Sequence, residues 1–231
     1  MKSVLDKIKG KVIVSVQAMP SEPLYDKTCM EAMMKSVITG GASALRVAGA
    51  RDVKIAKTLD VPVIGLTKPN ILPENWKEVV YITPTVKDAL DLVQAGADVI
   101  AFDGTMRQRP NNEKMEDLIE IIHTNNKLAM ADIATLEEGK NAQKLGADIL
   151  STTLAGYTKE SENSPTETPD FELLKDLVAQ TDLPVILEGR IWEPKQVDIA
   201  FELGAHCVVI GSAITRPQLI TKRFVFRNKG A

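Results

Sequence analysis

The chain has 231 residues, of which 44% are hydrophobic and 26% are charged, and its formal net charge is −3. This composition is typical of a globular protein with one large core, and a negative charge without a basic stripe argues against nucleic-acid binding. No apolar run is long enough to span a membrane, and the N-terminus has no apolar signal core, so we expect a cytoplasmic protein that does not bind membranes.

A short repeat divides the chain at regular intervals. Gly-Ala followed by an apolar run begins at Gly41, Gly96, Gly146 and Gly204. The copies are roughly 50 to 60 residues apart, which is the length of two strand–helix units. In each copy we expect the glycine to end a helix and the alanine to let the turn pack against the next strand. The repeat therefore predicts an α/β fold, a single (β/α)8 barrel domain over residues 1–231.

The predicted elements alternate along the chain. We expect the strands at Val12–Val16, Ala44–Val47, Val63–Leu66, Val99–Phe102, Leu128–Ala131, Ile149–Ser151, Val185–Leu187 and Cys207–Ile210. We expect the helices at Lys27–Thr39, Arg51–Thr58, Val86–Gln94, Glu113–Asn125, Leu136–Leu145, Phe171–Gln180, Glu193–Leu203 and Gln218–Phe226. A short helix near Ser3–Lys9 would cover the bottom of the barrel. The polar loops Pro69–Trp76 and Thr158–Asp170 would lie on the active-site rim, although the second is equally compatible with a surface insertion.

Polar side chains follow the predicted strands at the end of the barrel where this fold places its chemistry. Lys68 and Glu188 directly follow buried strands, where a charge is costly, so we expect a catalytic role for both. Strands 3 and 7 are opposite in a ring of eight, so these two side chains should face each other across the barrel mouth. The other members of this ring are Gln17, Arg46, Asp103, Asp132, Thr152, Thr153 and Arg216. For Asp103 and Thr152 we favour a structural role, as part of an ion pair or a cap that closes the barrel mouth, instead of a catalytic role.

Lys68 can act as a base only if its pKa lies well below the ordinary value of about 10.4. Arg46 and Arg216, if close, would lower the pKa of Lys68, whereas Glu188 or Asp132 would raise it. The sequence leaves both outcomes open.

The last two strands each end in a glycine-containing turn, at Gly189 and at Gly211. Such glycines let backbone N–H groups approach a ligand closely, and the loops after strands 7 and 8 commonly bind phosphate in this fold. The sequence therefore predicts a phosphorylated small molecule as the ligand.

The remaining candidates point to no cofactor and no metal. His123 and His206 have no partner at metal-ligand spacing, and the two cysteines, Cys29 and Cys207, are expected to be reduced. Arg107 and Arg109 belong to a charged loop that is more often solvated, although both could reach a phosphate or a neighbouring subunit. No nucleotide-binding glycine motif, acyl-transfer triad or zinc pattern is present in the sequence.

Nearly the whole chain resembles the N-acylglucosamine-6-phosphate 2-epimerases, also called N-acetylmannosamine-6-phosphate epimerases. The resemblance is carried by Ser15-Val16-Gln17-Ala18, Gly40-Gly41-Ala42-Ser43-Ala44-Leu45-Arg46, Tyr81-Ile82-Thr83-Pro84-Thr85, Asp103-Gly104-Thr105, Arg109-Pro110-Asn111, Ala129-Met130-Ala131-Asp132-Ile133, the run from Ser151 to Thr158, Glu188-Gly189-Arg190-Ile191 and the run from Gly211 to Pro217. Two positions depart from the pattern: Pro69 stands where a basic residue is common, and Ser212 where glycine is common.

The resemblance implies a cofactor-independent interconversion of N-acetylmannosamine 6-phosphate and N-acetylglucosamine 6-phosphate in sialic acid breakdown, by an enzyme that is a homodimer. It implies that Lys68 is the base and Glu188 the second catalytic group. It also implies binding sites for the rest of the substrate. Gln17, Arg46, Asp132, Thr153 and Arg216 would bind the sugar and its N-acetyl group, and Gly189, Arg190, Gly211, Ser212 and Ala213 would hold the phosphate.

The chemistry fits the ring of polar residues. The hydrogen on carbon 2 of the open-chain sugar is α to an aldehyde, so a base can remove it without a redox cofactor. Glu188 would help to open the sugar ring, Lys68 would take the proton, and Arg46 or Gln17 would donate to the developing oxyanion. The proton could return from Lys68 or from an opposing acid.

Three alternatives predict different residues. A ribulose-phosphate epimerase would need metal-binding histidines at strand ends, and a thiamine-phosphate synthase would need carboxylates for magnesium and pyrophosphate. A barrel that only binds RNA or a regulatory ligand would have a basic rim and an incomplete ring of charges. The sequence favours none of these patterns.

Overall fold

The computed structural model describes residues 3–226, and eight parallel strands form a closed barrel in the order in which they occur in the sequence. The strands are β1 Val12–Val16, β2 Leu45–Ala48, β3 Val63–Leu66, β4 Val99–Asp103, β5 Leu128–Asp132, β6 Ile149–Ser151, β7 Val185–Glu188 and β8 Cys207–Ile210. The register closes the ring, since Val14 pairs with Leu45 of β2 and Val12 pairs with Val208 of β8. The predicted (β/α)8 barrel is confirmed. The predicted domain also includes residues 1–2 and 227–231, which lie outside the described residues.

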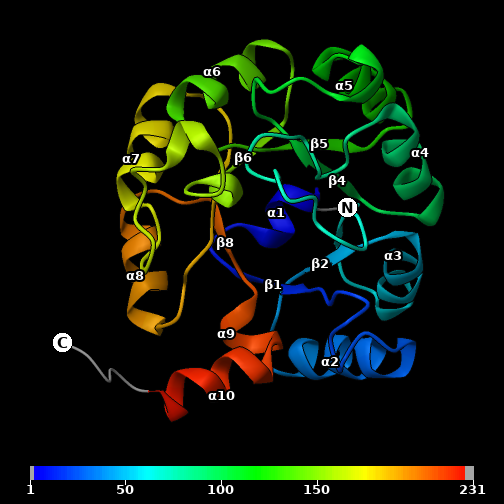
Figure 1. Cartoon of the computed structure of the whole chain (residues 1–231), viewed down its shortest axis with the longest axis vertical. Coiled ribbons are helices and arrows are strands. Elements are labelled where there is room, and N and C mark those ends of the chain that lie inside the picture. Colours follow the sequence, from blue (N-terminus) through cyan, green and yellow to red (C-terminus); the bar gives the residue numbers. More distant parts are fainter. Residues whose placement is uncertain (1–2, 227–231) are drawn as a thin grey trace.

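Helices α2 to α8 surround the barrel on its outer side (Figure 1). The helices are α1 Val4–Ile8, α2 Lys27–Thr39, α3 Ala50–Ala56, α4 Val86–Ala95, α5 Met115–Thr124, α6 Leu136–Lys144, α7 Phe171–Gln180, α8 Pro194–Glu202, α9 Ser212–Thr215 and α10 Pro217–Val225. Short 3-10 turns occur at Lys57–Leu59, Pro110–Asn112, Thr152–Leu154 and Lys159–Ser161. Within residues 3–226, no helix is long and apolar enough to cross a membrane.

The four Gly-Ala turns share one geometry. Gly41, Gly96, Gly146 and Gly204 all have φ between 94° and 101°, a conformation that glycine adopts without strain. In each turn the alanine N–H donates to the carbonyl five residues earlier, as in Ala97 to Leu92. This bond satisfies a carbonyl at the end of the preceding helix and directs the chain into an even-numbered strand.

Side chains that alternate along each strand fill two separate layers. One set, which includes Ile13, Ile64 and Met130, packs inside the barrel, and the other set packs between strands and helices. Helix α1 lies over the centre of the ring in Figure 1 and buries Ile8 against the interior set. His206 contacts the Leu5 carbonyl of α1 at 3.1 Å. The N-terminal helix therefore closes the bottom of the barrel, as the sequence predicts.

Three strands are one residue longer than predicted. Asp103, Asp132 and Glu188 are the last residues of β4, β5 and β7, whereas the sequence places them just after these strands. Each continues the strand pairing: Asp103 pairs with Asp132, and Glu188 pairs with Val209. A charged residue can end a buried strand here because ion pairs inside the barrel compensate its burial.

Candidate active site

A cavity of about 470 Å³ opens at the carboxyl ends of the strands. Its walls come from β1, β7 and β8 and from the segments that follow β1, β3, β6, β7 and β8, which places it where this fold binds its substrates. Its volume suits a small ligand. The predicted site residues that line it are Gln17, Lys68, Thr153, Glu188, Gly189, Arg190, Gly211, Ser212 and Arg216.

Lys68 stands just after β3 and projects into this cavity. Its Nζ donates to Gln17 Oε1 at 3.0 Å, and Gln17 Nε2 donates to Ser15 Oγ at 2.8 Å. Burial, reinforced by Arg46, lowers the pKa of Lys68 to about 8, against the raising effects of Glu188 and Asp132. The question that the sequence leaves open is therefore decided in favour of a lowered pKa.

Glu188 ends β7 and lines the same cavity. Its Oε2 forms an ion pair with Arg46 Nη1 at 3.0 Å and lies 3.1 Å from Thr153 Oγ1, within hydrogen-bond distance. Thr152 Oγ1 donates to the Glu188 carbonyl at 3.0 Å and accepts from its N–H at 3.1 Å. Burial raises the pKa of Glu188, although Arg46 acts in the opposite direction. Thr152 thus holds the backbone of Glu188 while Arg46 and Thr153 orient its carboxyl group.

Arg46 and Asp132 form a fully buried ion pair inside the barrel. Arg46 Nη1 and Nη2 donate to the two carboxylate oxygens of Asp132 at 3.0 and 2.6 Å. Burial acts to lower the pKa of Arg46, but Asp132 and Glu188 raise it above its ordinary value. Neither Arg46 nor Asp132 is among the described residues that line the cavity. Both contact residues that do line it: Arg46 pairs with Glu188, and Asp132 Oδ1 lies 2.8 Å from the Thr153 hydroxyl, closer than Glu188 does.

The predicted phosphate site lies between the ends of β7 and β8. Gly189 and Arg190 both have positive φ, 109° and 56°, so the turn after β7 is tight. Gly211 is the N-cap of α9, a short helix that the sequence analysis missed. Of the five predicted phosphate residues, Ala213 is the one that does not line the cavity within the described chain.

Two further cations lie at this side of the cavity. Arg190 Nη1 donates to the Ala155 carbonyl at 2.9 Å, and its guanidinium lies 4.6 Å from the centre of the Tyr157 ring. Arg216 forms an ion pair with Glu22 at 2.8 Å. Glu22 comes from the segment between β1 and α2, and no motif in the sequence marks it.

Aromatic side chains on the cavity wall are also missing from the sequence prediction. Trp76 packs edge-on against Tyr81, with ring centroids 6.4 Å apart, and lies 6.2 Å from Tyr157. The three rings come from the segments after β3 and β6. The sequence predicts that loops after β3 and β6 lie on the active-site rim, but it does not indicate which aromatic residues of these segments enter the cavity.

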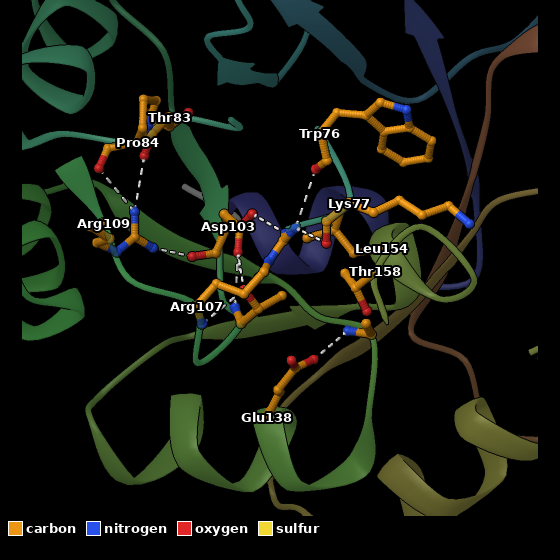
Figure 2. Close-up of polar contacts among 12 residues, drawn as sticks. Trp76, Lys77, Thr83, Pro84, Asp103, Arg107, Arg109, Glu138, Leu154 and Thr158 are labelled. Carbon is orange, nitrogen blue, oxygen red and sulfur yellow. Dashed lines mark hydrogen bonds and ion pairs between the residues drawn. The ribbon is translucent and has the colours of Figure 1, made fainter. Parts of the chain in front are cut away.

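A second buried cluster lies beside the cavity, around Asp103 (Figure 2). Arg107 Nη2 pairs with Asp103 Oδ2 at 2.7 Å, and Thr105 Oγ1 donates to Asp103 Oδ1 at 2.6 Å. Arg109 donates to the main-chain oxygens of Asp103, Thr83 and Pro84. Burial raises the pKa of Asp103 even with Arg107 beside it. The ion pair expected for Asp103 is present, whereas Arg107 and Arg109 are buried instead of solvated.

The two histidines have structural partners. His123 lies 2.8 Å from Asp148, and His206 contacts α1 as described above. Over residues 3–226, no group of three or more His, Cys, Asp or Glu side chains is placed to hold a metal ion.

Comparisons with known proteins agree with one another over almost the full length. A family model described as "Putative N-acetylmannosamine-6-phosphate epimerase" matches residues 30–229. The chain is also similar to two proteins named "Putative N-acetylmannosamine-6-phosphate 2-epimerase". The one from Clostridium perfringens (strain 13 / Type A) is 47% identical over 222 residues, and the one from Clostridioides difficile (strain 630) is 45% identical over 223 residues. These matches cover 96% of this chain and 98% and 97% of the two relatives.

Solved structures show the same likeness. The N-acetylmannosamine-6-phosphate 2-epimerase from Clostridium perfringens superposes with a TM-score of 0.91 at 46% identity, covering 97% of this chain and 96% of that chain. A thiamine phosphate pyrophosphorylase from Pyrococcus furiosus matches with a TM-score of 0.61 at 17% identity, covering 95% of this chain and 93% of that one. The second likeness concerns the fold alone.

Proposed function

Because the chain belongs to the N-acetylmannosamine-6-phosphate epimerase family, we propose that its cavity interconverts N-acetylmannosamine 6-phosphate and N-acetylglucosamine 6-phosphate, as in sialic acid breakdown. The observation that carries this proposal is the pair formed by Lys68 and Glu188. Both line one cavity from strands four places apart in the ring, and burial moves their pKa values toward each other. Such a pair suits proton transfer at a carbon centre near neutral pH.

Lys68 is proposed as the base. In the open-chain sugar the C2–H bond breaks, its proton moves to the neutral Nζ, and the electron pair forms an enolate with the C1 aldehyde. A pKa of about 8 leaves a neutral fraction of roughly one-tenth at pH 7, which an ordinary lysine does not provide. The hydrogen bond to Gln17 fixes the position of Nζ.

Glu188 is proposed as the acid–base group of ring opening. The anomeric hydroxyl loses its proton, the bond between C1 and the ring oxygen breaks, and the ring oxygen receives a proton. A carboxyl with a raised pKa is able to give and take protons in these steps. Thr153 and Arg46 hold it in one orientation, and Asp132 holds both of them, so we propose positioning roles for Arg46 and Asp132.

Gln17 is the more suitable of the two expected oxyanion donors. It lines the cavity next to Lys68, whereas the terminal nitrogens of Arg46 are occupied by two carboxylates inside the barrel. We propose that the Gln17 side-chain amide donates to the enolate oxygen and that Arg216 holds the sugar. Backbone N–H groups around Gly189, Arg190, Gly211, Ser212 and Ala213 would bind the phosphate.

Proton NMR of N-acetylmannosamine 6-phosphate in heavy water tests the proposal. We expect the wild-type protein to form the gluco epimer with deuterium at carbon 2. Lys68→Ala should lose this activity by at least about a hundredfold, because the proton acceptor is removed. Lys35→Ala, which removes an exposed lysine on α2, is the matched control and should keep it. A folded wild-type protein that converts none of the substrate would contradict the proposal.

The same spectra separate two routes for the returning proton. If Lys68 delivers the proton after the intermediate turns, part of the original hydrogen reappears in the product in the earliest turnovers. If an opposing acid such as Glu188 delivers it, the hydrogen at carbon 2 of the product comes from solvent. Retained substrate hydrogen would therefore contradict the two-base route.

We also propose that the enzyme is a homodimer that acts in the cytoplasm. The last residues of helix α10, Phe224 and Val225, and its C-cap Phe226 are apolar and exposed to solvent, and exposed apolar groups of this kind commonly mark a protein interface. Cys29 and Cys207 are free thiols, as is usual in reducing compartments.

A further inference from the structure

One wall of the cavity is apolar and aromatic, and the proposed chemistry does not use it. Trp76 and Tyr81 form this wall, and Leu72 also lines the cavity; all three lie in the segment between β3 and α4. The two rings pack edge-on, so each restricts the movement of the other. A rigid aromatic surface of this kind suits a small apolar substituent on an otherwise polar ligand.

This aromatic wall adjoins the proposed base. Thr67, the residue before Lys68, donates its N–H to Thr83 Oγ1 at 3.0 Å, and the Thr83 N–H donates to the Thr67 carbonyl at 3.1 Å. Tyr81 is two residues before Thr83, so Lys68 and Tyr81 leave the same pair of hydrogen-bonded segments. Both side chains then enter the cavity.

Arg107 fixes the wall from behind. Its Nη1 donates to the main-chain oxygens of Lys77 and Trp76 at 3.0 and 3.4 Å, while Nη2 pairs with Asp103. Figure 2 shows the Trp76 indole ring extending away from this cluster. The guanidinium thus ties the loop backbone to the end of β4 and leaves the ring free to face a ligand.

Tyr81 carries a free hydrogen-bond donor. Within residues 3–226, its hydroxyl has no hydrogen-bond partner, although the side chain is largely buried and lines the cavity. Burial, and then the carboxylate of Asp103, raise the pKa of Tyr81 to about 12. The hydroxyl therefore stays protonated across the working pH range and can donate to a ligand carbonyl.

The proposed orientation of the substrate would place its acyl group at this wall. If the 6-phosphate binds between β7 and β8 and C2 meets Lys68, the sugar spans the cavity from β7 and β8 toward the end of β3. The acylamino group is bonded to that same carbon and would therefore lie near Thr83 and Tyr81, in the segment that is hydrogen-bonded to Thr67. Neither Arg46 nor Asp132, which the family resemblance associates with the N-acetyl group, lines the cavity.

We propose that Trp76 and Tyr81 form the acyl subsite: the Trp76 ring packs against the acyl methyl group and the Tyr81 hydroxyl donates to the acyl carbonyl oxygen. This assignment rests on the proposed epimerase function and deepens it. The subsite sets which N-acyl sugar phosphates are accepted, and Arg107 acts through Trp76 as a positioning residue.

The test compares the N-acetyl substrate with its N-butanoyl analogue. Trp76→Ala opens space beside the acyl methyl, so we expect kcat/KM for the butanoyl substrate to rise about tenfold relative to that for the acetyl substrate. Trp76→Phe should shift the same ratio in the same direction by less, and it keeps an aromatic ring if the alanine variant does not fold. Tyr81→Phe should raise KM for the acetyl substrate about two- to tenfold and leave the pH profile unchanged.

Trp192→Ala is the matched control, because Trp192 lines the same cavity on the β7 side. It should change kcat/KM for both substrates by the same factor. Equal acetyl-to-butanoyl ratios in Trp76→Ala, Trp76→Phe and Trp192→Ala would overturn the acyl subsite alone. A wild-type protein without activity on the acetyl substrate would overturn the epimerase function and the subsite together.

Discussion

Lys68 owes its reactivity to residues that are remote from it in the sequence. Burial and Arg46 lower its pKa to about 8, while Glu188 and Asp132 act in the opposite direction. Arg46 is held near by its bidentate pair with Asp132. Arg46 thus pairs with two carboxylates, those of Asp132 and Glu188, and its charge still disfavours the protonated form of Lys68.

This balance predicts the pH dependence of the reaction. The base must be neutral, and its neutral fraction grows about tenfold per pH unit below the pKa. We therefore expect kcat/KM of the wild-type enzyme to rise about tenfold from pH 6 to pH 7, to reach half of its maximum near pH 8 and to level off above it. Initial rates measured across this range would show it, with circular dichroism confirming that the protein stays folded. A flat profile between these values would contradict a lysine base.

The sequence locates the polar ring at the barrel mouth but not the depth of each side chain. Lys68 and Glu188 could be singled out because each follows an apolar strand. Arg46 and Asp132 have equally polar positions, yet they lie inside the barrel and pair with each other. Strand register and side-chain direction decide which polar residues enter the cavity and which are buried inside the barrel. Neither can be read from a single sequence. The contribution of Trp76 and Tyr81 depends in the same way on how a loop folds back.

At the scale of elements, the loop between β3 and α4 depends on a buried charge. Arg107 and Asp103 are almost fully buried as a pair, and Arg107 also holds two main-chain oxygens of the loop. A buried pair of this kind adds little net stability when complete, but removal of one partner leaves a charge without compensation. The loop is therefore fixed by an interaction that tolerates little change.

We predict that Arg107→Met lowers the free energy of unfolding by about 3–5 kcal/mol, because Asp103 keeps its burial and loses its cation. Urea denaturation monitored by tryptophan fluorescence measures this change. Lys57→Met is the matched control, since it breaks the more exposed pair with Asp98 and should cost less than about 1 kcal/mol. Equal losses in the two variants would show that the Arg107 pair is not specially buried in solution.

The regular elements follow from local patterns, and the irregular ones do not. The Gly-Ala turns and the apolar strands identify the barrel because each turn needs a positive φ and each strand is buried on both faces. Helix α9 has four residues, too few for a periodic apolar pattern, and the sequence analysis missed it. Strands β4, β5 and β7 extend one charged residue beyond the apolar run that predicts them, because Asp103, Asp132 and Glu188 continue the strand pairing.

At the scale of the whole molecule, helix α10 differs from the other helices of the ring. It has no buried residue within its described length, and it packs mainly on α9. Figure 1 shows it lying along the edge of the barrel near α2 and α9, with its far end extending away from the ring. A helix that leaves its apolar side chains exposed gains little from the fold of its own chain, which is why we expect a second subunit to cover it.

We therefore predict that the wild-type protein is a dimer in light scattering at micromolar concentration and that Phe224→Asp is largely a monomer. The Phe224 side chain is 76% exposed in the single chain, so the substitution should disturb the interface and not the barrel core. Thr221→Asp adds the same charge to an exposed position on the same helix and should remain dimeric. Circular dichroism should show both variants folded. A monomeric wild-type protein would exclude the dimer, and a dimeric Phe224→Asp would place its interface elsewhere on the barrel.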